Sequence, residues 1–284
     1  MTPSATSEPG SRLRIRHETT YRYAAAPAAL AQLVRLTPSD GVGQRVIAWR
    51  VTNERGDAPL AFADGYGNAC HLFTRQDQRS ESRIVAEGEV ETLGASSLGV
   101  NEPVRPRYFL RETRLSAPTP RLRALGDEAR RTGGGNAQAE LRVLARLVCE
   151  RVAHLESRTS VGTPADVALA GGAGVCQDRA HVFLAAARAL GYPARYVSGY
   201  WHGAAATDAG AMHAWAEAWT PDDEWIALDP SSGDIAAHAH VRVAVGLDYT
   251  EAAPIRGTRR GGAGELLAVR VSVDALRAEA AQQQ

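Results

Sequence analysis

Residues 171–181 read Gly-Gly-Ala-Gly-Val-Cys-Gln-Asp-Arg-Ala-His, a glycine-rich loop that leads into a cysteine. Apolar residues then recur at helical spacing over 183–190, and Gly191 and Pro193 follow as residues typical of a helix end. The pattern places Cys176 at or near the N-terminus of a helix. We expect the helix dipole and the unpaired amides of the first turn to stabilise a thiolate there, so Cys176 is a candidate nucleophile.

The residues that flank the cysteine are candidates for contacts to a substrate or to an oxyanion. Gly174 allows the backbone to approach a ligand closely, and Gln177 contributes a first-turn amide. Asp178 could tune the thiol, or it could be a first-turn acid that the helix dipole favours. The sequence does not identify the second oxyanion donor.

A predicted β-hairpin supplies the partners that a thiolate needs for catalysis. Alternating runs over 212–219 and 224–230 flank a turn. If the turn centres near Pro221, His213 on the first strand faces Asp229 on the second. Directly opposed side chains lie within about 5 Å at Cβ, so the aspartate can fix the imidazole tautomer. The hairpin therefore predicts a base and its orienting acid.

The remaining cysteines and histidines have structural interpretations. The cysteines lack CxxC spacing, which argues against a disulfide framework or a zinc site, and Cys70 and Cys149 lie in apolar patterns typical of a core. His238 and His240 form a His-x-His pair with no further ligand pair nearby, so no metal is expected. Trp215 belongs with the aromatic residues of a sheet core, or it could line the cleft and donate its indole N–H.

The composition bounds the class of protein. The 284 residues are 44% hydrophobic, which is enough for a core, and 32 basic residues balance 32 acidic ones. This balance indicates neither a nucleic-acid partner nor a membrane surface. The polar start of the chain does not resemble a signal peptide, and no apolar stretch is long enough to cross a bilayer. We expect a cytoplasmic protein without a cofactor; its oligomeric state is left open.

The order of the patterns predicts an α+β protein of two domains. Short strand-like runs such as 13–18, 46–51 and 82–92 suggest a β-sandwich. Helical patterns over 122–131 and 137–155 begin after a proline-rich break. The predicted organisation is listed in chain order: a disordered tail over 1–11, a β-rich domain over 12–118, a catalytic domain over 119–275 and a C-terminal tail over 276–284.

These motifs resemble those of bacterial transglutaminase-like proteins in the papain-like superfamily. The resemblance is carried by Gly-Val-Cys-Gln-Asp and Ala-His within 174–181, His-Ala-Trp-Ala-Glu at 213–217 and Leu-Asp-Pro at 228–230. Residues 64–68 resemble part of the family's β-rich N-terminal domain, and 243–257 resemble the segment after the core.

The resemblance implies a papain-like catalytic domain with Cys176 as nucleophile, His213 as base and Asp229 as the orienting acid. It also suggests that Tyr249 contacts substrate or belongs to a structural cap. The chain departs from the family at Arg179, where an aromatic residue is common, and this change could alter the cleft.

The expected reaction is thiol-dependent acyl transfer on a peptide, a protein or a small carboxamide through a thioester. Resolution by water would make a cysteine protease or amidase, and this is the favoured reading. Resolution by an amine would make a transglutaminase or an amide ligase. A non-catalytic peptide-binding protein that retained the fold is the alternative from another class.

Overall fold

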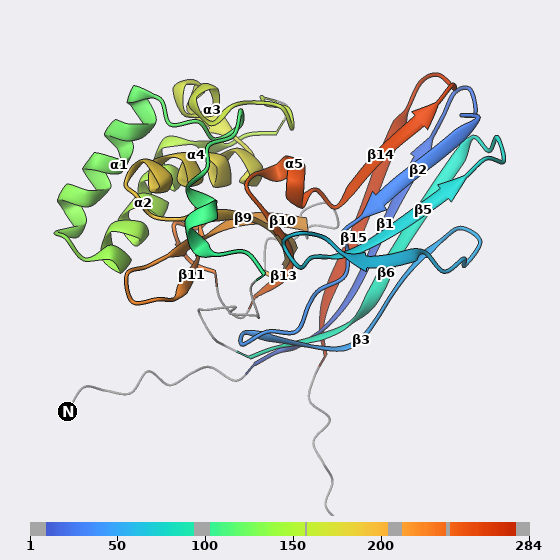
Figure 1. The fold of residues 1–284 in the computed structure, drawn as a ribbon, viewed down its shortest axis with the longest axis horizontal. Coiled ribbons are helices and arrows are strands. Elements are labelled where there is room, and N and C mark those ends of the chain that lie inside the picture. Colours follow the sequence, from blue (N-terminus) through green and yellow to red (C-terminus); the bar gives the residue numbers. More distant parts are fainter. Residues whose placement is uncertain (1–9, 94–102, 157, 204–211, 237–238, 277–284) are drawn as a thin grey trace, which may run out of the picture.

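The computed structural model describes residues 10–93, 103–156, 158–203, 212–236 and 239–276. Most of the predicted tails, 1–11 and 276–284, lies outside these residues, as does His238. Two β-sheets form one part of the molecule, and helices around a third sheet form the other (Figure 1). No helix among the described residues combines the length and apolar character needed to span a bilayer.

The β-rich part consists of two four-stranded antiparallel sheets, which agrees with the predicted β-sandwich. Strand β1 (Arg12–Arg22) buries alternate side chains from Leu13 to Thr19, the period expected of a strand with one covered face. Ser82 donates a hydrogen bond of 2.6 Å to Gln32 of the other sheet, and both side chains are buried. The first sheet has the order β15 (Leu266–Leu276), β1, β6 (Glu81–Thr92), β3 (Gln44–Asn53). The second has the order β14 (Ile255–Arg260), β2 (Ala29–Val34), β5 (Ala69–Arg75), β4 (Leu60–Ala63).

The C-terminal strands return to this β-rich part, which corrects the predicted end of the catalytic domain at 275. Strand β15 pairs with β1 along its whole length, and β14 pairs with β2. Both sheets would otherwise leave β1 and β2 as open edges. The core therefore ends near Pro254, and 255–276 complete the sandwich.

The helical part surrounds α4 (Cys176–Ala189), which is buried along most of its length and packs on the core sheet. Helix α2 (Ala137–Arg151) is capped by Asn136, whose Oδ1 accepts from the Ala139 amide at 2.9 Å. The other helices are η1 (Pro106–Leu110), α1 (Pro120–Gly133), α3 (Ala165–Gly171) and α5 (Tyr249–Ala252).

Helix α2 ends earlier than the predicted 155, because the chain after it pairs with the loop before α4. Strand β7 (Ala153–His154) runs parallel to β8 (Ala173–Gly174). This tertiary pairing outweighs the helical pattern of the sequence, and it brings His154 beside the glycine loop.

The core sheet is antiparallel and has β10 at its centre, as Figure 1 shows in part. Its order is β12 (Asp234–Ile235), β11 (Trp225–Asp229), β10 (Met212–Trp219), β9 (Ala194–Trp201), β13 (His240–Gly246). Strand β13 is thus an edge strand, and it faces the sandwich.

Two side-chain amides of the sandwich pair with the backbone of β13. Gln44 accepts from the Arg242 amide at 2.8 Å and donates to the Arg242 carbonyl at 2.9 Å. Asn68 makes the same pair of bonds with Val245, both at 2.8 Å. The two side chains take the place of a neighbouring strand, so they satisfy a buried sheet edge and join the two parts of the molecule.

We expect Gln44→Ala to lower the free energy of unfolding by about 1–3 kcal/mol, because it removes the two hydrogen bonds that the Gln44 side chain makes to the buried backbone of Arg242. Urea denaturation followed by circular dichroism measures this loss. Arg45→Ala on the same strand is the control, since its ion pair with Glu91 is exposed and should contribute less than about 1 kcal/mol. Equal losses in the two variants would contradict the role of Gln44.

Candidate functional site

Cys176 is the first residue of α4, as predicted, and its neighbours fix the helix start. Asp178 Oδ2 accepts from the Val175 amide at 2.8 Å and from the Thr159 hydroxyl at 2.6 Å. A Cβ on Gly174 would lie 2.7 Å from the same carboxylate oxygen, so only glycine fits there. Gly174 and Asp178 therefore hold the backbone that presents the cysteine.

The first turn of α4 offers amides that the helix itself does not use. The first hydrogen bond at the helix start runs from the Arg179 amide to the Val175 carbonyl at 3.1 Å. Helix geometry thus leaves the amides of Cys176, Gln177 and Asp178 without an intrahelical carbonyl. Cys176 and Gln177 line a cavity, so an oxyanion formed beside the thiol would lie next to these donors.

The hairpin of β10 and β11 brings His213 to Asp229 in a register that differs from the predicted one. Trp219 faces Trp225 rather than Asp223. The reason lies in the turn, where Asp223 adopts a left-handed φ of 58° and the Thr220 amide bonds the Glu224 carbonyl at 3.0 Å. The turn centre moves by one residue, and the pairing therefore shifts by two.

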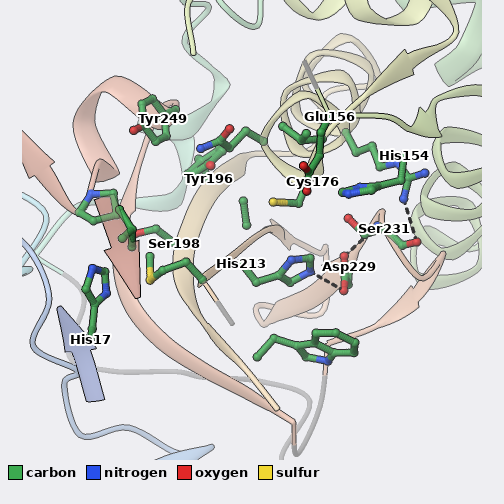
Figure 2. Close-up of a pocket in the computed structure, with 18 of the residues that line it drawn as sticks. His17, His154, Glu156, Cys176, Tyr196, Ser198, His213, Asp229, Ser231 and Tyr249 are labelled. Atoms are coloured by element: carbon green, nitrogen blue, oxygen red, sulfur yellow. Dashed lines mark hydrogen bonds and ion pairs between the residues drawn. The ribbon is translucent and has the colours of Figure 1, made fainter. Parts of the chain in front are cut away.

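A shift of two residues keeps every side chain on its predicted face. His213 and Asp229 become diagonal neighbours, and His213 Nε2 lies 2.8 Å from Asp229 Oδ2 (Figure 2). The other oxygen, Oδ1, accepts from the Ser231 amide at 2.8 Å. The carboxylate is 3% exposed and is bonded through both oxygens, which fixes its orientation.

A second histidine shares this carboxylate. His240 Nε2 lies 3.2 Å from Asp229 Oδ2, and its ring is edge-on to that of Trp215, with centroids 5.1 Å apart. His213, Asp229 and His240 each offer one ligand atom, and these three atoms lie within 4.8 Å of one another. Such a group could hold a metal ion. Hydrogen bonds from two imidazoles to one carboxylate explain the same grouping without an ion.

The charges of this group are coupled. Burial opposes ionisation of Asp229, but hydrogen bonds from His213 and His240 hold the pKa of its carboxyl well below the ordinary value. An ionised carboxylate only accepts, so both rings donate through Nε2. Burial likewise opposes protonation of His213, but its hydrogen bonds to Asp229 and Cys176 raise its pKa to about 10.

Cys176 and His213 open onto a cavity of about 800 Å³ between the helical core and the sandwich (Figure 2). Asp229, Gln177 and Tyr249 also line it, whereas Trp215 is fully buried in the sheet and does not. Sequence patterns missed other lining residues, because pairings between segments that are distant in the chain bring them to the cavity. These residues include His17, Thr19 and Tyr21 of β1, His154 and Glu156 after α2, and Leu267 and Val269 of β15.

Arg179, where the sequence departs from the family pattern, supports the turn that follows β11. Its guanidinium donates to the Val152 carbonyl at 2.7 Å and to the Ser231 carbonyl at 3.1 Å. The thiol of Cys149 donates to the same Ser231 carbonyl at 3.2 Å. Arg179 thus links α4 to the end of α2 and to the backbone beside Asp229.

Two buried residues beside α5 have structural roles. Asp248 caps α5, since its Oδ1 accepts from the Thr250 amide at 2.7 Å. His181 is buried and accepts from the Tyr249 amide at 3.1 Å.

Two protein families match this chain. Residues 123–230 match the transglutaminase-like superfamily, and residues 13–91 match the bacterial transglutaminase-like N-terminal region. The predicted family resemblance is thereby confirmed, as is its combination of a β-rich N-terminal region with a transglutaminase-like core.

Similar proteins span most of the chain. Uncharacterized protein ML0607 of Mycobacterium leprae is 29% identical over 272 residues, which cover 88% of this chain and 94% of that protein. The Protein-glutamine gamma-glutamyltransferase of Pseudomonas aeruginosa is 29% identical over 196 residues, 56% of this chain but 27% of that protein. A solved structure of a candidate cysteine protease from Cytophaga hutchinsonii has a TM-score of 0.76 at 18% identity and covers 96% of this chain and 93% of its own, which shows a shared fold.

We expect His213 to keep its proton through neutral pH and to lose it as the pH rises through about 10. Because this pKa is raised above the ordinary histidine value of 6.5, the stability that it contributes is fully present below that value and is lost as the pH rises through about 10. NMR titration of protein labelled at histidine measures the pKa of His213, and the His213→Gln variant identifies the resonance of this residue. Asp229→Asn should lower the pKa, and a wild-type value at or below the ordinary one would contradict the geometry.

Proposed function

Residues 123–230 belong to the transglutaminase-like superfamily and residues 13–91 to the bacterial transglutaminase-like N-terminal region, and on this basis we propose that the protein is a thiol-dependent acyl-transfer enzyme. Its substrate class is a peptide or another carboxamide. Cys176 is the nucleophile, His213 the base and general acid, and Asp229 the acid that orients the histidine.

One observation carries this proposal. The 2.8 Å bond from His213 Nε2 to Asp229 fixes the tautomer, so Nδ1 is the nitrogen left for the thiol of Cys176. The three residues come from α4, β10 and β11, and all three line one cavity. A nucleophile, a base and an orienting acid at one cavity are the set that nucleophilic catalysis requires.

In the first step the thiolate of Cys176 attacks the carbonyl carbon of the substrate. A C–S bond forms while the C=O electron pair moves to the oxygen, which the first-turn amides of α4 can stabilise. The carbonyl then re-forms, the C–N bond breaks, and His213 gives its proton to the departing nitrogen. The products are a free amine, or ammonia from a primary carboxamide, and a thioester on Cys176.

In the second step a nucleophile resolves the thioester. His213 takes its proton while the oxygen or nitrogen of the nucleophile forms a bond to the carbonyl carbon. The C–S bond then breaks, which releases a carboxylic acid or a new amide and returns the thiolate. We favour water as this nucleophile, because the exposed residues His154 and Glu156 line the same cavity and leave a path from solvent. The relative from Pseudomonas aeruginosa, a protein-glutamine gamma-glutamyltransferase by name, supports an amine as the second candidate.

A non-catalytic peptide-binding protein is the alternative from another class. A pure binder has no chemical need for a thiol, an imidazole and a buried carboxylate in one cavity, whereas an enzyme requires them to act together. The reactivity of the thiol separates the two cases.

We expect iodoacetamide to alkylate Cys176 at pH 7 at least about tenfold faster than it alkylates glutathione, because the imidazolium of His213 stabilises the thiolate. His213→Gln should remove most of this difference. Mass spectrometry of the peptide that contains Cys176 measures the rate, and buried Cys70 is an internal control. A rate equal to that of glutathione would favour the binding protein.

We expect Cys176→Ala to abolish turnover while the protein stays folded, because no other group of the site can form the thioester. A library of glutamine-containing peptides, incubated with and without added amines and analysed by mass, measures both the reaction and the acceptor. Free acid product supports water, and amine adducts support transglutamination. Residual activity above about one percent of wild type would refute Cys176 as nucleophile.

A further inference from the structure

The cavity has two chemically different ends on either side of Cys176. Figure 2 shows His154 and Ser231 toward one side of the thiol, and His17, Ser198 and Tyr249 toward the other. The charged lining residues Glu156, Arg179 and Asp229 all come from the helical core. None of the described lining residues that the sandwich contributes is arginine, aspartate or glutamate.

Six of the described lining residues come from the sandwich, and we call them the sandwich wall. They are His17, Thr19 and Tyr21 of β1, Ile255 of β14, and Leu267 and Val269 of β15. Three of the six are aliphatic. The wall therefore adds an apolar surface to a cavity whose other end is polar.

Two polar residues of the wall, His17 and Thr19, are hydrogen-bonded to each other, and His17 is also bonded to the core. His17 Nε2 lies 2.8 Å from Thr19 Oγ1, and Tyr200 Oη lies 3.3 Å from His17 Nδ1. Burial lowers the pKa of His17 to about 4, so its ring is neutral at physiological pH, and burial is the main cause that raises the pKa of Tyr21 to about 12. The wall thus carries no charge that an apolar ligand would have to desolvate.

Two side chains of the wall are more exposed than their neighbours on the same strand face. Leu267 is 58% exposed and Val269 is 42% exposed, whereas Val271 is 3% exposed. The buried neighbour packs against the core, and the two exposed ones face the cavity. A ligand that covers them gains free energy, because it removes apolar surface from water.

The wall is fixed relative to the thiol. Gln44 and Asn68 bond the edge strand β13, and the Tyr66 hydroxyl bonds Glu251 of α5. These contacts hold the sandwich on the core beside the cavity. A surface that is held in place before binding loses little entropy when a ligand arrives.

We propose that the sandwich wall binds a large apolar group of the acyl donor, close to the carbonyl that Cys176 attacks. This inference rests on the proposed function of Cys176 as the acylated residue. It assigns the sandwich a part in choosing the substrate, with Leu267 and Val269 as the residues that contact the apolar group.

Two probes, which differ only in whether they can alkylate Cys176, test whether the sandwich wall of the full chain binds an apolar tail. N-hexylacetamide carries the apolar tail but no iodide that Cys176 could displace, so isothermal titration calorimetry measures its binding without alkylation. N-hexyliodoacetamide carries the same tail, and its alkylation forms a C–S bond to Cys176 and releases iodide. We expect saturable binding of the first probe, and alkylation by the second at least about tenfold faster than by iodoacetamide, after correction for their rates with glutathione.

Three variants on strand β15 show which side chains cause the binding of the tail and the faster alkylation. Leu267→Ser and Val269→Ser should each weaken N-hexylacetamide binding at least about fivefold and remove most of the gain in alkylation over plain iodoacetamide. Leu266→Ser is the control, since Leu266 is 74% exposed on the same strand but does not line the cavity. It should leave both measurements within about twofold of wild type.

The outcomes separate this inference from the proposed function. The proposal that the sandwich wall binds an apolar group would be overturned by either of two results. One is that wild type shows no saturable binding of N-hexylacetamide, and the other is that all three serine variants bind it equally. Slow reaction of Cys176 with plain iodoacetamide would count against its assignment as the nucleophile. Calorimetry with N-hexylacetamide would still decide whether the wall binds the tail.

Discussion

The carboxylate of Asp229 is a buried negative charge, and a buried charge persists only where donors compensate for the lost water. His213, His240 and the Ser231 amide supply these donors. The requirement fixes three things together: the ring of His213, the path of the chain after β11, and the position of that strand end against α4. Arg179 adds the last link, since it holds the Ser231 carbonyl from the helix that carries the thiol.

Buried backbone groups need hydrogen-bond partners just as a buried charge does. This requirement explains why both parts of the molecule line the cavity. The core sheet ends in β13, whose backbone would be an exposed edge without Gln44 and Asn68. The sandwich must therefore lie against this edge, and the chain returns through Pro254 to complete it. Because β15 then pairs with β1, a strand from each end of the chain lies beside the thiol.

Local patterns predicted the parts of the site that depend on short-range geometry. Helical spacing placed Cys176 at its helix start, and the alternation of β10 and β11 put His213 and Asp229 on one face even though the register was two residues off. Pairings between distant segments left no such signal. The pairing of Ala153 with Ala173 ended α2 early, and that of β15 with β1 moved 255–276 into the sandwich. Both depend on which open edge is available, a property of the assembled fold.

The two ends of the cavity also bear on the acceptor. Glu156 lies near Cys176 at the polar end (Figure 2), and a carboxylate beside an amine favours its protonated form. A protonated amine has no lone pair with which to attack a thioester, but protonation is what a departing amine needs. A carboxylate there thus helps an amine to leave more than it helps an amine to attack. Water carries no charge to be held there, and it can reach the thioester once the amine has gone, which is the physical reason to favour hydrolysis.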